Sequence, residues 1–281
     1  MPDVTAKFTI LHLSDVHATQ DELLYGQVDG LDRLRQVGDY VVAAGVTPEA
    51  VVVTGDLVQR GHAGVYDRVD RALRELGDRV GAPVFTVLGN HDSPTEARAL
   101  TGHGGGHYRV VTVGDLRLVL LDSSTGELDA DQLDWLADAV AEPFGSGTVV
   151  ALHHAPVPSP LPTLAKIGLR HPERLAHALT RSDTRLILAG HYHHPMTSLF
   201  HGLPVSVGPS LAYHQIMNAG PYTVSGHDLA MFSLVQVTAD QVSTAPVSLQ
   251  AGHPLFSTAV PSASRAPDLT SPAPLTRTIQ R

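Results

Sequence analysis

The chain has 281 residues, of which 43% are hydrophobic and 17% charged, a composition typical of a soluble globular protein. The formal net charge of −9 and the absence of a Lys/Arg cluster argue against binding a polynucleotide along a phosphate-neutralising face. There are no cysteines, so disulfides and thiolate ligands are excluded, and any bound metal must be held by nitrogen and oxygen atoms.

The organisation along the chain predicts one main domain. The N-terminal residues lack a basic segment followed by an apolar core, and no apolar run approaches membrane-spanning length. We therefore expect no signal peptide, no transmembrane segment and a cytoplasmic location. Residues 1–250 are expected to form the domain. Residues 251–281 are rich in Pro, Ser, Thr and Ala, which predicts a loosely ordered C-terminal tail.

Strands and helices alternate in the first part of the chain. Apolar runs predict strands at Phe8–Leu13, Ala50–Thr54 and Val84–Leu88, while apolar residues at helical spacing predict helices over residues 28–44 and 65–76. This alternation indicates a mainly parallel sheet, and ligands bind such sheets outside the carboxyl ends of the strands.

The later elements follow a different order. We expect a hairpin, two helices and six more strands, namely a hairpin of residues 108–113 and 116–121, helices at 129–140 and 172–180, and strands at 148–152, 185–189, 197–199, 205–207, 229–237 and 241–247. No long helix separates the last four strands. They are therefore expected to form a mainly antiparallel second sheet packed on the first.

Polar clusters follow five of the predicted strands. They are Asp15 with His17, Gly55-Asp56, Gly89-Asn90-His91-Asp92, His153-His154 and Gly190-His191-Tyr192-His193. A single histidine after a strand is usually a solvated loop residue, but five coincident clusters indicate a metal site. By contrast, His103 and His107 lie in a glycine-rich loop without phosphate-binding spacing, and both are expected to face solvent.

In this order the clusters resemble the calcineurin-like metallophosphoesterase superfamily over residues 11–193, and Gly-Asn-His-Asp is most similar to class III cyclic nucleotide phosphodiesterases. The resemblance implies an α/β fold, a four-layer α-β-β-α sandwich in which two mixed β-sheets pack face to face and are flanked by helices. Residues 1–250 would be the metallophosphoesterase domain.

The resemblance also implies a centre of two metal ions. One ion would be held by Asp15, His17, Asp56 and His193, and the other by Asp56, Asn90, His153 and His191, with Asp56 bridging them. His153 is preferred to His154 from its position in the family pattern, although the residues alone admit either. These ligand types suit Fe, Mn, Zn or Co and do not distinguish among them.

In the mechanism implied by the resemblance, a hydroxide bridging the two metals attacks phosphorus. His91 would neutralise phosphoryl charge and protonate the leaving oxygen, with Asn90 and His91 contacting substrate. Gln59 stands three residues after Asp56, where purple acid phosphatases carry tyrosine and many relatives carry an aspartate that orients the catalytic histidine. A tyrosinate-bound ferric ion is therefore not expected. The group that orients His91 stays open, with Asp92 as a substitute candidate.

The favoured function is a metal-dependent phosphodiesterase acting on a small phosphodiester, first 3′,5′-cyclic AMP. Alternatives are 2′,3′-cyclic nucleotides, glycerophosphodiesters or phospholipid head groups, and, from another class, a non-catalytic scaffold on the same fold. Residues 157–171 and 208–227, including Tyr213, His214 and Asn218, are structural loops in the favoured interpretation but could cover the site and contact a base. The resemblance further suggests a homodimer.

Overall fold

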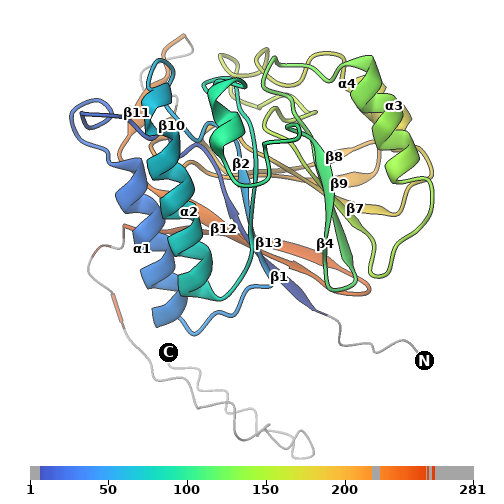
Figure 1. The fold of residues 1–281 in the computed structure, drawn as a ribbon, viewed down its shortest axis with the longest axis horizontal. Coiled ribbons are helices and arrows are strands. Elements are labelled where there is room, and N and C mark those ends of the chain that lie inside the picture. Colours follow the sequence, from blue (N-terminus) through green and yellow to red (C-terminus); the bar gives the residue numbers. More distant parts are fainter. Residues whose placement is uncertain (1–6, 217–221, 251, 253–254, 257–281) are drawn as a thin grey trace, which may run out of the picture. The chain divides into compact units, whose positions relative to one another are not determined.

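The computed structural model describes residues 7–216, 222–250, 252 and 255–256 (Figure 1). The chain divides into two units, Met1–Gln250 and Ala251–Arg281, and the architecture that follows is that of the first. The tail expected at 251–281 lies almost wholly outside the described residues, as does Asn218. Within the described ranges, every helix is too short or too polar to span a bilayer.

The first sheet has five strands in the order β13-β12-β1-β2-β3. Its parallel part is β1 (Phe8–Leu13), β2 (Ala50–Thr54) and β3 (Val84–Val87). The C-terminal strands β12 (Met231–Val237) and β13 (Val242–Ser248) complete it, and β12 pairs antiparallel with β1.

The second sheet has six strands in the order β4-β5-β6-β7-β9-β8. They are β4 (Arg109–Val113), β5 (Leu116–Leu120), β6 (Thr148–Ala151), β7 (Thr184–Ala189), β8 (Met196–Phe200) and β9 (Leu203–Val207). The strands from β5 through β6 and β7 to β9 are parallel, while β4 and β8 are antiparallel edge strands.

This arrangement corrects the expected division into a parallel sheet and a separate antiparallel sheet. The last four predicted strands exist, but two extend the first sheet and two extend the second. Alternating apolar and polar residues predict that a segment is a strand, but they do not predict which strand it pairs with. Strand pairing depends on apolar faces formed by residues distant in sequence. The two mixed sheets implied by the family resemblance are what the structure shows.

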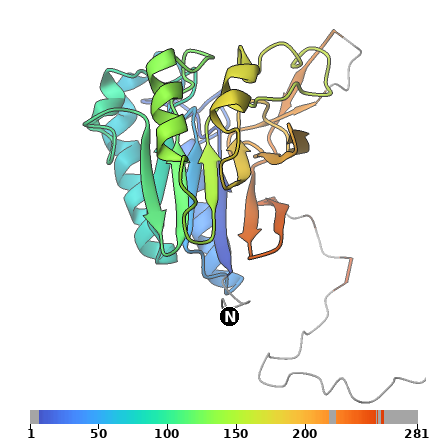
Figure 2. The ribbon, with the colours of Figure 1, turned by 90° about the vertical axis from the view of Figure 1, so that its right-hand side faces the viewer.

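Three apolar layers hold the sheets and helices together. Helices α1 (Gly30–Ala43) and α2 (Tyr66–Val80) pack on the outer face of the first sheet, and α3 (Ala130–Ala139) and α4 (Pro172–Ala178) on that of the second (Figures 1 and 2). Between the sheets, Ile10 and Val52 meet Leu118 and Leu188 in a buried cluster. The domain is therefore a four-layer α-β-β-α sandwich.

Local sequence signals set several element boundaries. Asp29 caps α1 by accepting from the backbone N–H groups of Leu31 and Asp32, and α2 ends at Gly81 in the left-handed conformation. Short 3₁₀ helices occupy Ala63–Val65 and Glu96–Ala99. A further hairpin, β10 (His214–Ile216) with β11 (Ser225–His227), lies within a segment expected to be a loop.

Candidate metal centre

All five polar clusters predicted at the strand ends meet on one side of the two sheets. The backbone joins the clusters directly, because Asp15 N–H donates to Gly55 O at 3.0 Å and Gly190 N–H donates to His153 O at 2.9 Å. The loops after β1 and β2 therefore lie against each other, as do those after β6 and β7. Glycine permits the close approach, since a Cβ at Gly89 would lie 2.3 Å from Asp56 Oδ1.

Strained backbone marks five of the predicted ligands. Residues Asp15, His17, Asp56, His191 and His193 all have positive φ, between 47° and 73°. Left-handed backbone is uncommon for residues other than glycine and persists where the surrounding structure enforces it, often at functional sites. Among the described non-glycine residues only nine have positive φ, so the coincidence points to a function for these five side chains.

The first group of side chains contains two carboxylates and two imidazoles. Asp15, His17, Asp56 and His193 each offer an atom within 4.8 Å of the others, and all four are buried. His193 Nε2 lies 3.2 Å from Asp15 Oδ1, and His17 Nε2 lies 3.6 Å from Asp56 Oδ2. This is the set that the family resemblance implies for one ion.

Hydrogen bonds fix which nitrogen of each ring faces this group. His193 donates Nδ1–H to Tyr213 O at 3.0 Å, and His17 donates Nδ1–H to Gln59 Oε1 at 2.8 Å. A carbonyl oxygen can only accept, so in the neutral rings Nε2 carries a lone pair. The two Nε2 atoms lie 3.1 Å apart. Two lone pairs facing each other beside two carboxylates repel, and a cation between them removes the repulsion.

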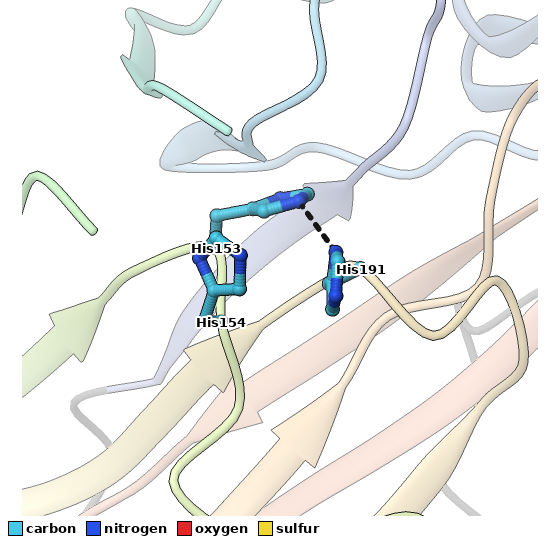
Figure 3. A group of neighbouring side chains, drawn as sticks. All are labelled: His153, His154 and His191. Carbon is cyan, nitrogen blue, oxygen red and sulfur yellow. Dashed lines mark hydrogen bonds between the residues drawn. The ribbon is translucent and has the colours of Figure 1, made fainter. Parts of the chain in front are cut away.

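The second group is centred on His153. Its Nδ1–H donates to Thr54 O at 2.7 Å, which leaves Nε2 as the nitrogen that faces the site. That atom lies 3.4 Å from Asp56 Oδ2, 3.2 Å from Asn90 Oδ1 and 3.1 Å from His191 Nδ1. Figure 3 shows the last of these contacts as a dashed line and His154 beside the pair. Asp56 is thus shared between the two groups.

His153 and His154 have different surroundings. Nδ1 of His154 lies 3.3 Å from Ser123 Oγ, and its ring packs 4.4 Å from that of His191. The three histidines His153, His154 and His191 can be grouped as potential ligands, but His153 is the one beside Asp56 and Asn90. The geometry supports the preference for His153 that the family pattern suggested.

The electrostatics keep two of the proposed imidazole ligands neutral and attract positive charge to the third, His153. Burial lowers the pKa of His17 to about 4 and that of His191 to about 3, so both rings are neutral at neutral pH. Burial opposes ionisation of Asp56, but the surrounding histidines, His153 first and then His17 and His91, together outweigh burial and hold the Asp56 pKa well below its usual range. Burial also lowers the His153 pKa, but Asp56 and the other surrounding acceptors together outweigh burial and raise the pKa to about 9. Without a metal this ring is protonated at neutral pH, and a metal ion would displace the proton from Nε2. The negative potential at His153 Nε2 attracts a cation.

These observations together fit a metal pair. Two buried side-chain atoms at the site, Asp15 Oδ1 and His191 Nε2, make no hydrogen bond within the described part of the chain. Buried polar atoms rarely lack a partner unless an unseen ion or water supplies one. Carboxylate, imidazole and carboxamide donors also suit divalent first-row metals. His and Asp groups that could bind metals are therefore present on both sides of Asp56.

The structure identifies a partner for His91, and it is Gln59. Gln59 Oε1 lies 3.1 Å from His91 Nδ1 as well as 2.8 Å from His17 Nδ1. Asp92 instead accepts from the backbone N–H groups of Leu57, Val58 and Gly89 and from the Tyr66 hydroxyl. It anchors the loops and is not the orienting group for His91.

Two features escaped sequence reasoning. His103 is buried and not solvent-facing, because its Nε2 lies 2.7 Å from Thr86 Oγ1 and its Nδ1 lies 3.0 Å from His107 Nδ1. The partly buried His107 is its neighbour in this cluster. The contact of the Tyr213 ring with His193, at 4.2 Å between centroids, carried no sequence signal beyond its place in a loop.

Comparison with known proteins adds a family match and close relatives. Residues 8–195 match the family model of calcineurin-like phosphoesterases. The chain is 40% identical over 221 residues to a probable cyclic nucleotide phosphodiesterase of Rhodococcus erythropolis, covering 75% of this chain and 73% of that protein. It is 35% identical over 257 residues to a cAMP/cGMP dual specificity phosphodiesterase of Mycobacterium tuberculosis, covering 88% and 81%.

Solved structures share the architecture at low identity. A dimetal phosphatase from Danio rerio aligns with a TM-score of 0.56 and 15% identity, covering 84% of this chain and 98% of that one. At this identity the match supports the fold alone.

Proposed function

Because the chain belongs to the calcineurin-like phosphoesterase family and is a hydrolase of phosphoric diesters, we propose a narrower substrate class. The proposed substrates are small cyclic nucleotides, first 3′,5′-cyclic AMP. The observation that carries the proposal is the shared carboxylate of Asp56. It lies 3.6 Å from His17 Nε2 on one side and 3.4 Å from His153 Nε2 on the other. A bridging carboxylate between two sets of ligands suits a two-metal site for displacement at phosphorus.

The proposed ligands divide into two sets around Asp56. Asp15, His17 and His193 would hold one ion with it, and Asn90, His153 and His191 the other. Bound there, a pair of Fe, Mn, Zn or Co ions would supply Lewis-acid activation of water and of the phosphoryl oxygens. The backbone carbonyls of Thr54 and Tyr213 orient His153 and His193, which keeps their Nε2 atoms directed inward.

His91 is proposed to protonate the leaving oxygen. Its backbone N–H donates to Asp56 Oδ1 at 2.7 Å, which fixes the residue beside the bridging carboxylate. Its ring packs edge-on against His17 at 4.7 Å, and Nδ1 is held by Gln59. Because Gln59 accepts from Nδ1–H, His91 would deliver a proton from Nε2 as the imidazolium, protonated at both nitrogens, and would be left as the neutral ring with its proton on Nδ1. Asn90, adjacent in sequence, would contact the phosphoryl group.

The relatives narrow the substrate class. The relatives from Rhodococcus erythropolis and Mycobacterium tuberculosis are named as a probable cyclic nucleotide phosphodiesterase and a cAMP/cGMP dual specificity phosphodiesterase. A third relative, the 3′,5′-cyclic adenosine monophosphate phosphodiesterase of Pseudomonas aeruginosa, is 32% identical over 200 residues. The third alignment covers 68% of this chain and 72% of that protein. These names support a cyclic nucleotide over a glycerophosphodiester. We also propose that residues 1–250 form the catalytic domain.

A substrate panel tests the proposal. We expect the Mn-loaded protein to hydrolyse 3′,5′-cyclic AMP with a higher kcat/KM than 2′,3′-cyclic AMP or glycerophosphocholine. A higher kcat/KM for glycerophosphocholine would show that the substrates are glycerophosphodiesters and not cyclic nucleotides. If the Mn-loaded protein hydrolyses none of these diesters, nor bis(p-nitrophenyl) phosphate, the proposed activity is wrong.

A further inference from the structure

Two tyrosines form an aromatic surface beside the first metal-binding group. The Tyr213 ring lies 4.2 Å from the His193 ring and 5.8 Å from the His17 ring, measured between centroids. Tyr25 meets Tyr213 edge-on at 5.6 Å. The two rings therefore continue outward from two of the proposed ligands, and Tyr25, 71% exposed, forms the outer end.

The loop that carries Tyr25 is held firmly in place. Leu24 and Val28 exchange backbone hydrogen bonds of 2.9 and 3.0 Å, which closes a tight turn with Tyr25 at its tip. Both residues pack in a small buried cluster with Ala212, against Tyr213. The segments at 24–28 and 212–213 therefore form one unit, so the position of Tyr25 relative to the metal ligands is fixed by packing.

Two properties of Tyr25 are costly for a residue without a function. A large aromatic ring stays mostly in water, and its backbone adopts φ 52°, a conformation that glycine or asparagine occupies with less strain. Tyr25 is not part of the main apolar core on either sheet. Exposed aromatic rings beside a binding site commonly present a flat face to a ligand.

We propose that Tyr25 and Tyr213 bind the nucleobase of the substrate. The proposal rests on the cyclic nucleotide function argued above. Because the Tyr213 ring borders His17 and His193, we place the base-bearing ester substituent of a phosphodiester held at Asp56 against the two tyrosines. A purine stacks on tyrosine through its π face and needs no specific hydrogen bond, so adenine and guanine are both accepted. Tyr25 and Tyr213 are thus specificity residues that distinguish nucleotides from phosphodiesters without a base.

Equilibrium binding tests the role of the rings without requiring turnover. The ligands are AMP and ribose 5-phosphate, which share the phosphate and sugar and differ by the base, titrated calorimetrically into the Mn-loaded protein. We expect the wild-type protein to bind AMP roughly 5- to 150-fold more tightly, the range for stacking of one base. Tyr25→Ala should lower this ratio several-fold by weakening AMP binding alone, because only Tyr213 is then left to contact the base, while Tyr25→Phe keeps the ratio.

Leu23→Ala is the matched control, because Leu23 is exposed on the same loop but carries no ring. It should keep the wild-type ratio. A ratio near one in the wild-type protein, no binding of either ligand, an unchanged ratio in Tyr25→Ala, or equal loss in Leu23→Ala would each overturn the proposal. The substrate panel decides the proposed function separately. A protein that prefers AMP but cleaves no cyclic nucleotide keeps the base site and loses the activity.

Discussion

Two histidine-rich regions of this chain differ in what they leave unpaired. Around Asp56, the rings of His17, His153 and His193 each donate Nδ1–H to a carbonyl oxygen, and their Nε2 atoms converge on carboxylates. Around Thr86, His103 has a partner for both ring nitrogens, namely the Thr86 hydroxyl and His107. In the part of the chain that the structure describes, neither ring nitrogen of His103 has a carboxylate as its hydrogen-bond partner.

Histidine content alone therefore does not indicate a metal site. Burial lowers the pKa of His103 to about 3, as it lowers that of His17 to about 4, so both rings are neutral. The difference is what the second ring nitrogen faces. At the Asp56 site a backbone or side-chain carbonyl oxygen accepts from Nδ1–H and leaves Nε2 facing carboxylates, whereas both ring nitrogens of His103 take part in hydrogen bonds within the protein. The Asp56 site therefore favours binding of a cation, whereas the ring nitrogens of His103 already have hydrogen-bond partners.

The largest effect is expected from removing the shared carboxylate. Asp56→Ala should lose metal from both groups and reduce hydrolysis to background, because both sets of ligands include Asp56. Metal content by mass spectrometry and turnover of bis(p-nitrophenyl) phosphate are the measurements. Asp78→Ala, an exposed change on α2, should behave as wild type. Retention of full metal content in Asp56→Ala would contradict the bridging role.

Removing His91 should separate chemistry from metal binding. His91→Ala is expected to lower kcat by roughly 10²- to 10⁴-fold, the usual contribution of a positioned general acid, while metal content stays near that of wild type. The matched control is His177→Ala, an exposed histidine on α4. Unchanged kcat in His91→Ala would remove this residue from the mechanism.

The next largest effect is expected at Gln59, because its side-chain oxygen is the hydrogen-bond partner of both His17, a proposed metal ligand, and His91, the proposed general acid. Gln59→Leu leaves His17 and His91 without their Nδ1 acceptor, and we expect a loss of roughly 10- to 100-fold in kcat/KM. Gln59→Glu keeps an acceptor oxygen and should retain more activity. Nitrogen NMR of the imidazoles should show that Nδ1 carries the proton in the wild-type protein and mixed tautomers in Gln59→Leu. Equal activities of the two variants would exclude an orienting role.

The smallest effect on activity is expected at the Thr86 region. His103→Phe should leave metal content and kcat unchanged, since these nitrogens serve only internal hydrogen bonds. The free energy of unfolding should fall by about 1–3 kcal/mol, because the buried Thr86 hydroxyl loses its partner. Urea denaturation measures the fall. Loss of bound metal in His103→Phe would contradict the claim that only the region around Asp56 binds metal.

The sequence predicted much of the fold and the members of the site for identifiable reasons. Local patterns predicted the strands, and Asp29, Asp129 and Pro172 begin helices where capping rules place them. The neighbours of β12 and β13 could not be predicted, since strand pairing is set by contacts distant in sequence. The ligand roles were predicted from the order of the motifs along the chain.

Other features depended on three-dimensional placement. Aspartate and histidine adopt positive φ more often than most residues, but neither requires it, so residue type alone did not predict the left-handed backbone of Asp15, His17 and Asp56. The hydrogen-bond acceptor of His91 could not be predicted from the sequence either. Gln59 departs from the family pattern at its position, and only the structure places its side-chain oxygen beside the His91 ring. The burial of His103 depends on packing around a loop whose glycines suggested exposure.

Anomalous X-ray scattering from a Mn-loaded crystal tests the central claim most directly. We predict two peaks, one among Asp15, His17, Asp56 and His193 and the other among Asp56, Asn90, His153 and His191. No peak is expected between Thr86, His103 and His107. Absence of a peak beside Asp56, or a peak at His103, would contradict the account.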